Sequence, residues 1–430
     1  MNHSRTRTAA LVAAVAVPAL VFTGCAGSGG SEAASDTISV VTRWASGSTE
    51  AEIQQRVFDK FTEDTGIKVE FTDGLEEIDD QVETAVAAGK APDLVIVNLY
   101  DKTLGWLDAG VTVPLDDQIE EWGLADRIQE SALDEWRVGS VPSGELQGLP
   151  YSGFSWPIWY NTDLLAQAGV TEVPETTDDL IAASTALRAA GIPPLIVGGN
   201  DWSGQKLFYQ IIQSYADADA TKKVMSEGGY CESDDIMKGI DLFTQLRDAG
   251  VFVDDVAGYT ADDMYATYFA EKAAIMPAAS WEFAPALEAG TDIQDVTQLG
   301  GLAIPADGTF TQPTAYQGFT GVGFMVTKQG AESDRVDLVR QLIEAFYSDD
   351  AVADFVTNGN NVTPVIGDFA DKAENPLLKA ALDLGDTVDY AVLPDVWIGS
   401  SSDPLIQVIT KAYGGGDAQE ICAGLDQATL

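Results

Sequence analysis

The 430-residue sequence nearly lacks histidine, and this absence excludes whole classes of chemistry. Its single histidine, His3, lies in an N-terminal segment that we expect to be removed. Without an imidazole, the remaining chain cannot form a serine or cysteine catalytic triad or a histidine-ligated metal site. No GxxxxGK[ST] loop occurs, and Gly318, Gly321 and Gly323 do not form a dinucleotide fingerprint. We therefore expect no metal and no cofactor, and no catalytic residue of a kind that depends on an imidazole.

Basic side chains are also scarce. Once Arg5 and Arg7 are set aside with the N-terminal segment, 21 lysines and arginines stand against 68 aspartates and glutamates. A chain with this balance has a solvated, self-repelling surface and does not attract nucleic acid or polyanionic ligands. We expect no nucleic-acid partner.

Only three cysteines occur, Cys25, Cys231 and Cys422. An exported compartment permits a disulfide between the last two. The sequence alone leaves this disulfide and two unpaired buried thiols as open alternatives.

The chain has one long apolar run, Ala9–Phe22, which follows two arginines and leads directly to Cys25. The run is short for a bilayer span and contains Pro18. It resembles a bacterial lipoprotein signal, and a plain transmembrane anchor is the alternative. The resemblance implies a signal peptide over residues 1–24, lipidation of Cys25 and a flexible tether over residues 25–36. The protein would then be exported and lipid-anchored at the outer face of the cell membrane.

The chain beyond the tether opens with alternating strand and helix patterns. Thr37–Thr42, Ile67–Thr72 and Asp93–Val97 read as strands, with two amphipathic helices between them. This β-α-β-α-β order is typical of a doubly wound α/β lobe. The length exceeds that of a usual single domain, so we expect two lobes. Further strands are predicted at residues 194–197, 273–277 and 321–327.

Gly148–Leu165 is unusually aromatic, since half of the ten residues from Tyr151 to Tyr160 carry rings. Buried indole and phenol groups need hydrogen-bond partners. We therefore interpret the stretch as an extended segment that crosses between two lobes, with some rings lining a cleft. An aromatic-rich core strand is the alternative.

Four tryptophans lie in predicted loops or at strand ends, next to polar residues: Trp44, Trp202, Trp281 and Trp397. Sugar rings present C–H faces that pack on flat aromatic surfaces, and their hydroxyls need donors and acceptors. This pattern favours a carbohydrate cleft. The topology agrees for Trp44, because ligands of open α/β sheets bind beyond the carboxyl ends of strands.

Acidic residues near these positions allow two interpretations. Glu50, Asp101, Asp201 and Glu282 could supply the paired carboxylates of a glycoside hydrolase. A carboxylate in an aromatic cleft can equally accept hydrogen bonds from sugar hydroxyls without transferring a proton. The sequence does not separate these alternatives.

Four segments resemble the extracellular solute-binding proteins of ABC importers, in the sugar-binding group that includes the maltose-binding proteins. They are FTEDTGIKVEF (61–71), APDLVIVN (91–98), YNTDLLAQAGVTEVPETTDDLIAASTALRAAG (160–191) and AAIMPAASWE (273–282). The resemblance implies an α/β, two-lobed periplasmic-binding-protein-like fold of type II, with a ligand cleft between the lobes. The N-terminal lobe would comprise residues 37–152 and 315–366, and the C-terminal lobe residues 153–314 and 367–430.

The resemblance also implies a set of ligand contacts around this cleft. Together with the acid next to Trp202, the candidate ligand-binding residues are Trp44, Glu50, Asp101, Tyr151, Asp201, Trp202, Trp281, Tyr316, Gln317, Gly318 and Trp397.

The function implied is that of a lipid-anchored, monomeric binding protein. It would capture a neutral mono- or oligosaccharide and deliver it unchanged to the permease subunits of an ABC importer. Two alternatives stay open: a secreted glycoside hydrolase with two catalytic acids, and a binding protein for a non-sugar solute such as a polyol or phosphodiester.

Overall fold

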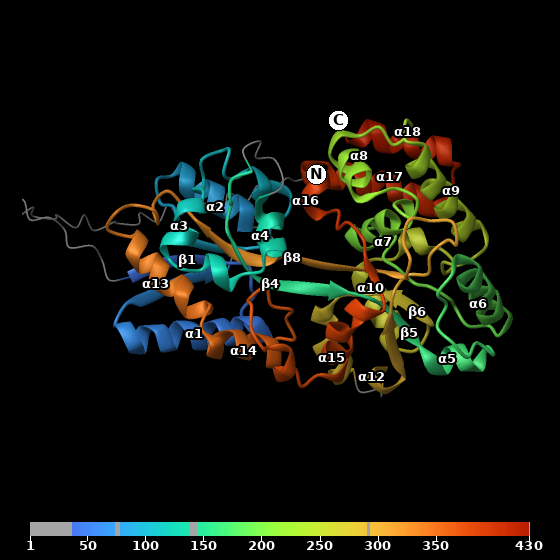
Figure 1. Ribbon diagram of the computed structural model, residues 1–430, viewed down its shortest axis with the longest axis horizontal. Coiled ribbons are helices and arrows are strands. Elements are labelled where there is room, and N and C mark those ends of the chain that lie inside the picture. Colours follow the sequence, from blue (N-terminus) through green and yellow to red (C-terminus); the bar gives the residue numbers. More distant parts are fainter. Residues whose placement is uncertain (1–36, 74–77, 138–143, 290–292, 430) are drawn as a thin grey trace, which may run out of the picture. The chain divides into compact units, whose positions relative to one another are not determined.

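The computed structural model describes residues 37–73, 78–137, 144–289 and 293–429. The predicted signal peptide, the tether and Cys25 lie outside these residues. The described chain folds into two lobes, each built from a sheet and the helices packed around it (Figure 1). None of the helices in these ranges is both long enough and apolar enough to cross a bilayer.

The sheet of the first lobe has the strand order β2-β1-β3-β8-β4, and β9 pairs with β8. Strands β1, β2 and β3 are parallel, whereas β8 runs antiparallel to both β3 and β4. The bounds are β1 (Thr37–Thr42), β2 (Lys68–Asp73), β3 (Leu94–Val97), β4 (Leu149–Trp156), β8 (Thr314–Val326) and β9 (Asp389–Tyr390). The predicted β-α-β-α-β opening is therefore confirmed.

Helix α1 (Thr49–Thr65) shows how the sequence determines this lobe. The Ser48 side chain accepts a hydrogen bond from the backbone N–H of Ala51, which caps the first turn. Gly66 ends the helix in the left-handed conformation, with φ 77°. Between them the predicted stripe of Ile53, Val57, Phe58 and Phe61 is buried. The other helices of this lobe are α2 (Ile78–Ala87), α3 (Asp116–Glu121), α4 (Glu130–Arg137), α13 (Val336–Phe346) and α14 (Asp349–Thr357).

The second lobe contains a smaller antiparallel sheet with the order β6-β5-β7. Its strands are β5 (Ile158–Asn161), β6 (Ile275–Pro277) and β7 (Thr297–Gly300). Around it lie α5 (Thr162–Gln167), α6 (Thr177–Ala189), α7 (Trp202–Ile212), α8 (Ala218–Glu227), α9 (Asp234–Asp248), α10 (Ala261–Phe269), α11 (Phe283–Glu288), α12 (Ile293–Val296), α15 (Pro376–Leu382), α16 (Asp395–Ile398), α17 (Ser402–Gly414) and α18 (Ala418–Ala428).

The strand predicted at residues 194–197 is reduced to isolated bridges. Leu195 bridges to Phe252 and to Ile275, and no longer ladder forms there. Pro193 precedes this segment and Pro194 is its first residue, and proline lacks the backbone N–H that would donate to a neighbouring strand. The sequence does not predict strand β7, because its four residues (TQLG) show little alternation of apolar and polar side chains.

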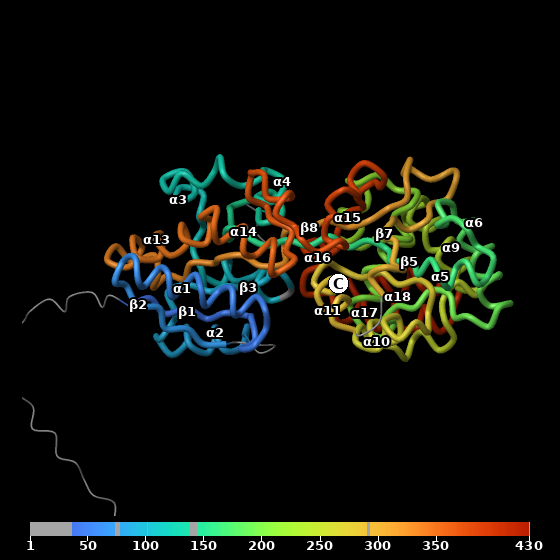
Figure 2. The backbone as a smooth tube through the Cα atoms, turned by 90° about the horizontal axis from the view of Figure 1, so that it is seen from below, coloured from blue at the N-terminus to red at the C-terminus, as the bar shows by residue number. Residues whose placement is uncertain are grey.

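The aromatic segment crosses between the lobes as predicted. Strand β4 pairs with β8 in the first sheet, and β5 pairs with β6 and β7 in the second, with only Pro157 between them. Figure 2 shows the chain passing from one lobe to the other along β8 as well. The exact limits of the two lobes stay a prediction.

Cys231 and Cys422 form a disulfide, which closes the alternatives that the sequence left open. Their Cα atoms are 5.1 Å apart, and 191 residues separate them in sequence. The bond ties the segment before α9 to α18, so it fixes the C-terminal helix to the body of the second lobe.

Replacing both cysteines by serine should lower the free energy of unfolding by about 2–5 kcal/mol, because a crosslink over a long loop restricts the unfolded chain. Denaturant titration of the oxidised protein and the double variant measures this difference. The wild-type protein in reducing agent is the matched control and should behave like the variant. Equal stability in all three samples would contradict a structural role for the bond.

Candidate functional site

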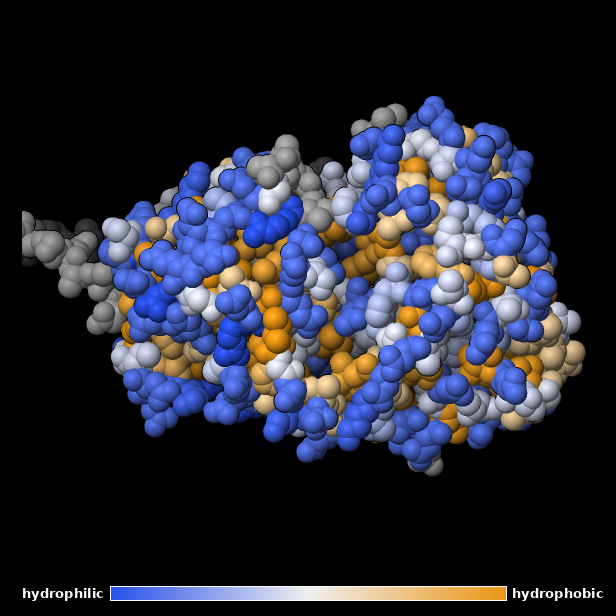
Figure 3. Space-filling model, viewed as in Figure 1, coloured by the Kyte–Doolittle hydropathy of each residue, from blue (hydrophilic) through white to orange (hydrophobic). Residues whose placement is uncertain are grey.

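A cavity of about 560 Å³ lies between the two lobes. In the space-filling view the surface is hollowed at this position, and hydrophobic residues gather along the hollow (Figure 3). The residues that line it are Arg43, Trp44, Ala45, Ser48, Glu50, Asn98, Leu99, Tyr100, Ser152, Gly153, Phe154, Trp202, Lys206, Ser280, Trp281, Thr320, Gly321, Val322, Asn361 and Asp395.

The first lobe contributes residues from the ends of its parallel strands. Arg43 and Trp44 directly follow β1, and Asn98 and Tyr100 follow β3. Since the carboxyl ends of parallel strands meet at one edge of the sheet, both groups reach the same cavity. The hydroxyl of Tyr100 also hydrogen-bonds with that of Ser402 at the start of α17, which joins the two lobes along this wall.

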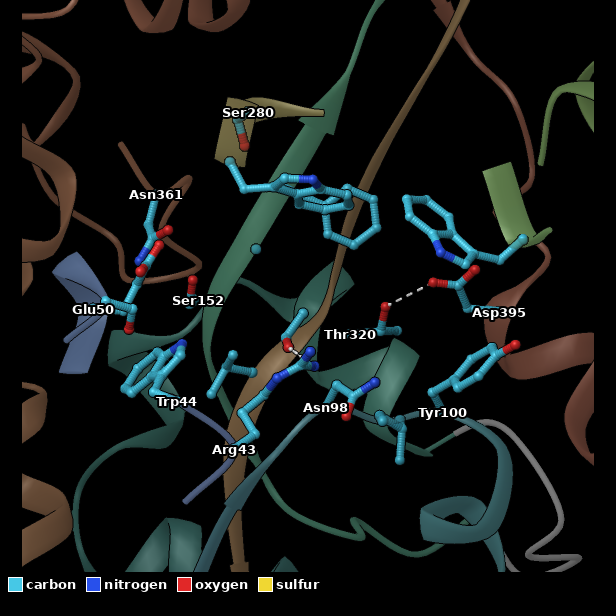
Figure 4. Close-up of a pocket in the computed structure, with 18 of the residues that line it drawn as sticks. Arg43, Trp44, Glu50, Asn98, Tyr100, Ser152, Ser280, Thr320, Asn361 and Asp395 are labelled. Carbon is cyan, nitrogen blue, oxygen red and sulfur yellow. Dashed lines mark hydrogen bonds between the residues drawn. The ribbon is translucent and has the colours of Figure 1, made fainter. Parts of the chain in front are cut away.

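One side of the cavity is polar (Figure 4). Glu50 on α1, Asn361 and Ser152 lie there next to the ring of Trp44. The side-chain N–H₂ group of Asn361 is buried and has no hydrogen-bond partner in the described part of the chain. A buried donor without a partner carries a desolvation cost that a ligand acceptor would remove.

Aromatic rings form another wall of the cavity. Phe154 and Trp202 line it, and the ring of Trp281, with 36% of the residue exposed, is the most open of the group. The ring centroid of Trp281 lies 5.4 Å from that of Phe154 and 5.6 Å from that of the buried Trp156. These edge contacts fix the orientation of Trp281 while its remaining surface faces open space.

Two cations and two carboxylates also line the cavity. Burial lowers the pKa of the Arg43 guanidinium, and the charges of Asp79 and Glu50 act in the opposite direction. Burial raises the pKa of Glu50, and Arg43 opposes that rise. On the other side of the cavity the ammonium group of Lys206, on α7, is paired directly with the carboxylate of Asp395, on α16.

Four of the predicted ligand-binding residues line the cavity: Trp44, Glu50, Trp202 and Trp281. Asp101 begins a 3-10 helix over Asp101–Gly105, and its side chain lies outside the described part of the structure. The other predicted residues do not line the cavity.

Two of these are tyrosines in the protein core. Tyr151 is only 3% exposed, and its ring stacks on Phe324 with centroids 4.8 Å apart. Tyr316 is fully buried, and its hydroxyl donates to the backbone oxygen of Lys206 at 3.0 Å. It therefore supports a residue of the cavity wall from behind.

The remaining predictions also fall on supporting positions. Asp201 caps α7 and accepts hydrogen bonds from the backbone N–H groups of Ser203 and Ala261. Gln317 pairs with Ser155 along β4 and β8, and Gly318 lies against the side chain of Leu393. Trp397, on α16, lies 5.2 Å from the ammonium group of Lys222 and packs on the core.

Among the polar residues that line the cavity, only Glu50 belongs to the predicted set of ligand contacts. The topology that favours Trp44 after β1 also favours Asn98 and Tyr100 after β3, and both line the cavity. Arg43, the polar neighbour of Trp44 in sequence, lines it as well. Lys206, Thr320 and Asn361 carry no comparable local signal, since tertiary packing alone brings them to the cavity. Asp395 is the polar neighbour of Trp397 in sequence, and it lines the cavity whereas Trp397 does not. Within the described residues, no group of three or more His, Cys, Asp and Glu residues is arranged to hold a metal ion.

The sequence profile described as "Bacterial extracellular solute-binding protein" matches residues 45–353. A "Probable sugar-binding periplasmic protein" of Rhizobium meliloti is 28% identical over 235 residues, which cover 52% of each chain. The chain spans about half the length, or less, of the curated sugar-binding relatives it matches. Each is described as a binding protein.

Solved structures with the same fold cover nearly the whole chain. A "probable secreted solute-binding lipoprotein" from Streptomyces coelicolor is 34% identical, with a TM-score of 0.83 over 92% of this chain and 99% of that one. A maltose-bound protein from T. maritima is 16% identical, with a TM-score of 0.69 over 91% and 98% of the two chains. The second likeness shows the fold alone.

Glu135, on α4, lies behind the cavity and accepts a hydrogen bond from the backbone N–H of Phe319 at 2.6 Å. Burial raises the pKa of its carboxyl group to about 8, the charge of Asp395 adds to this, and Lys206 acts against it. The carboxyl group therefore keeps its proton at neutral pH, next to a charged pair that lines the cavity.

The stability of the protein should consequently fall as the pH rises from 4.5, the ordinary pKa of this group, towards about 8. In that range the folded chain binds more protons than the unfolded chain, so deprotonation favours unfolding. Glu135→Gln removes this part of the dependence and should raise the free energy of unfolding at pH 9 by on the order of 2 kcal/mol. Denaturant titrations at several pH values measure it. Glu130 is exposed on the same helix, so Glu130→Gln is the matched control. If the free energy of unfolding depends on pH in the same way in the wild type and in Glu135→Gln, the raised pKa of Glu135 is refuted.

Proposed function

The chain belongs to the bacterial extracellular solute-binding proteins, and we propose that it captures a neutral mono- or oligosaccharide and delivers it to the permease subunits of an ABC importer. The observation that carries this proposal is the composition of the interlobe cavity. An exposed tryptophan face stands in a cavity whose other side is polar. A sugar has the same two characters, with apolar C–H faces and a rim of hydroxyl groups.

The polar groups suit hydroxyl ligands. Glu50 can accept hydrogen bonds from hydroxyl hydrogens, and the unpartnered side-chain N–H₂ group of Asn361 can donate to a hydroxyl oxygen. Asn98 and Ser152 can do both. Hydrogen bonds to a carboxylate are stronger than those between neutral groups, so Glu50 would fix the orientation of the sugar.

Binding without chemical change fits the state of the two carboxylates. Asp395 is already paired with Lys206 and accepts a hydrogen bond from Thr320, so it is poorly placed to act as an acid or a nucleophile. Glu50 and Asp395 lie on opposite sides of the cavity in Figure 4. A two-carboxylate hydrolase also places its acids on either side of the scissile bond, so this placement does not separate the two functions. The difference is that both acids of a hydrolase must be free to act, whereas Asp395 is held by Lys206.

We further propose that Cys25 carries a lipid that holds the protein at the outer face of the cell membrane, where it works as a monomer. The signal-like run before Cys25 supports this, as does the description of the Streptomyces coelicolor relative as a lipoprotein. The short polar tether would let the folded body reach a permease in the same membrane.

A calorimetric titration with a panel of neutral mono- and oligosaccharides tests the function. We expect saturable binding of at least one sugar and its recovery unchanged after incubation. Heat from none of the sugars would refute the proposal, and glycoside turnover would favour a hydrolase. Binding of a polyol or a phosphodiester in the parallel arm would favour a different solute class.

Trp281→Ala should weaken sugar binding at least tenfold, roughly 1.4 kcal/mol or more, because it removes the exposed stacking surface. The melting temperature of the ligand-free variant should change little. Tyr151→Ala is the contrasting variant, and it should cost about 3–5 kcal/mol of folding stability because this ring lies in the core. Full sugar affinity in the Trp281 variant would show that the ring does not contact the ligand.

A further inference from the structure

Lys206 and Asp395 form a charged pair in the wall of the cavity. Their side chains are 9% and 11% exposed, respectively. The ammonium group also lies 5.4 Å from the ring centre of Trp156 and 5.7 Å from that of Phe154. The second carboxylate oxygen of Asp395 accepts a hydrogen bond from the hydroxyl of Thr320 at 3.3 Å. Both charges are therefore held in place by several elements of the fold.

The cavity is electrically balanced. Its charged lining residues within the described chain are Arg43 and Lys206 on the positive side and Glu50 and Asp395 on the negative side. Arg43 lies in the field of Glu50 and of Asp79, and Lys206 is in direct contact with Asp395. Burial makes such interactions stronger than they are in water, so each cation is largely cancelled by its neighbours.

This balance bears on the choice of ligand. An anionic sugar gains affinity from a cation that has no other partner. Here it would meet Lys206, which is already paired with Asp395, and Arg43, which lies in the field of Glu50 and Asp79. It would also be repelled by the two carboxylates that line the cavity, and a neutral sugar does not meet this repulsion. Specificity of this kind arises from rejection as much as from attraction.

We propose that Asp395 is a specificity-determining residue, which makes the cavity selective for uncharged sugars by cancelling the charge of Lys206. This inference rests on the proposed function, since it concerns the sugar site itself. Asp395 acts through Lys206, so removing its charge should expose an ammonium group to the ligand. The rings of Trp156 and Phe154 would keep that group in position.

The test compares three ligands of one shape: a neutral hexose that the wild-type protein binds, the matching hexuronate and the matching hexosamine. Wild-type protein should bind the hexose at least about tenfold more tightly than either charged analogue. In Asp395→Asn, the dissociation constant of the hexuronate should fall at least about tenfold relative to that of the hexose. Lys206→Gln leaves Asp395 unpaired and should lower the dissociation constant of the hexosamine by a similar factor relative to that of the hexose. The double variant should return to the neutral preference.

The exposed Asp386 provides the matched control, because Asp386→Asn makes the same change in net charge away from the cavity. Its ligand preference should equal that of the wild type. A merely structural role of Asp395 would lower the affinity for all three ligands in parallel, and this result would overturn the inference. Equal wild-type affinity for hexose and hexuronate would also overturn it, without reference to any variant.

Melting curves establish that each variant is folded. If Asp395→Asn does not fold, the dissociation constants of Lys206→Gln for the hexosamine and the hexose test the inference instead. The result also separates this inference from the function on which it rests. A wild-type protein that binds no sugar refutes the proposed function. A wild-type protein that binds a neutral hexose, with unshifted ratios in the folded variants, refutes only the role of Asp395.

Discussion

The antiparallel pairing of β4 with β8 is the constraint on which the rest of the structure depends. Both strands run from one lobe towards the other, and their paired backbone forms part of the cavity wall. The register is irregular between Pro150 and Ser152 and again between Ser152 and Phe154. Irregularities of this kind redirect side chains. As a result Ser152, Gly153 and Phe154 all line the cavity although they are consecutive.

Close packing at this crossing explains why a glycine stands at position 153. A Cβ atom there would lie 2.5 Å from the backbone oxygen of Gly318 and 2.5 Å from the ring of Phe319. The backbone N–H of Gly153 donates a hydrogen bond to the backbone oxygen of Val362 at 2.7 Å, and Val362 directly follows Asn361. One small residue thus links the crossing strand to the loop that carries a polar ligand contact of the proposed site.

The cavity combines an apolar wall with buried charges, and the two features depend on each other. Aromatic packing excludes water around Lys206, which raises the cost of leaving its charge unpaired. The pair with Asp395 offsets that cost, and Tyr316 supports the backbone of Lys206 from behind. Burial also keeps the carboxyl group of Glu135 protonated, so that no further negative charge arises near Asp395.

The regular elements could be predicted from sequence because each has a periodic pattern of apolar residues and a residue that caps or ends it. The buried stripe of α1 between Ser48 and Gly66 is one example, and β1, matched over its whole length, is another. The site could be predicted only in part. Tyr151 and Trp281 both stand among aromatic and polar neighbours in sequence. Only tertiary packing buries Tyr151 in the core and leaves Trp281 36% exposed. Asn361 reaches the cavity from a segment without periodicity, where no pattern indicates a site. In the segment of Trp397 the pattern does indicate a site, but Asp395 lines the cavity and the tryptophan does not.

The most direct measurement for this account is a crystal structure of the protein with a bound sugar. We expect the sugar in the interlobe cavity, chemically intact, with one ring face against Trp281 and hydroxyl groups in hydrogen bonds with Glu50 and Asn361. A sugar bound elsewhere on the molecule, or a cleaved product between Glu50 and Asp395, would contradict it.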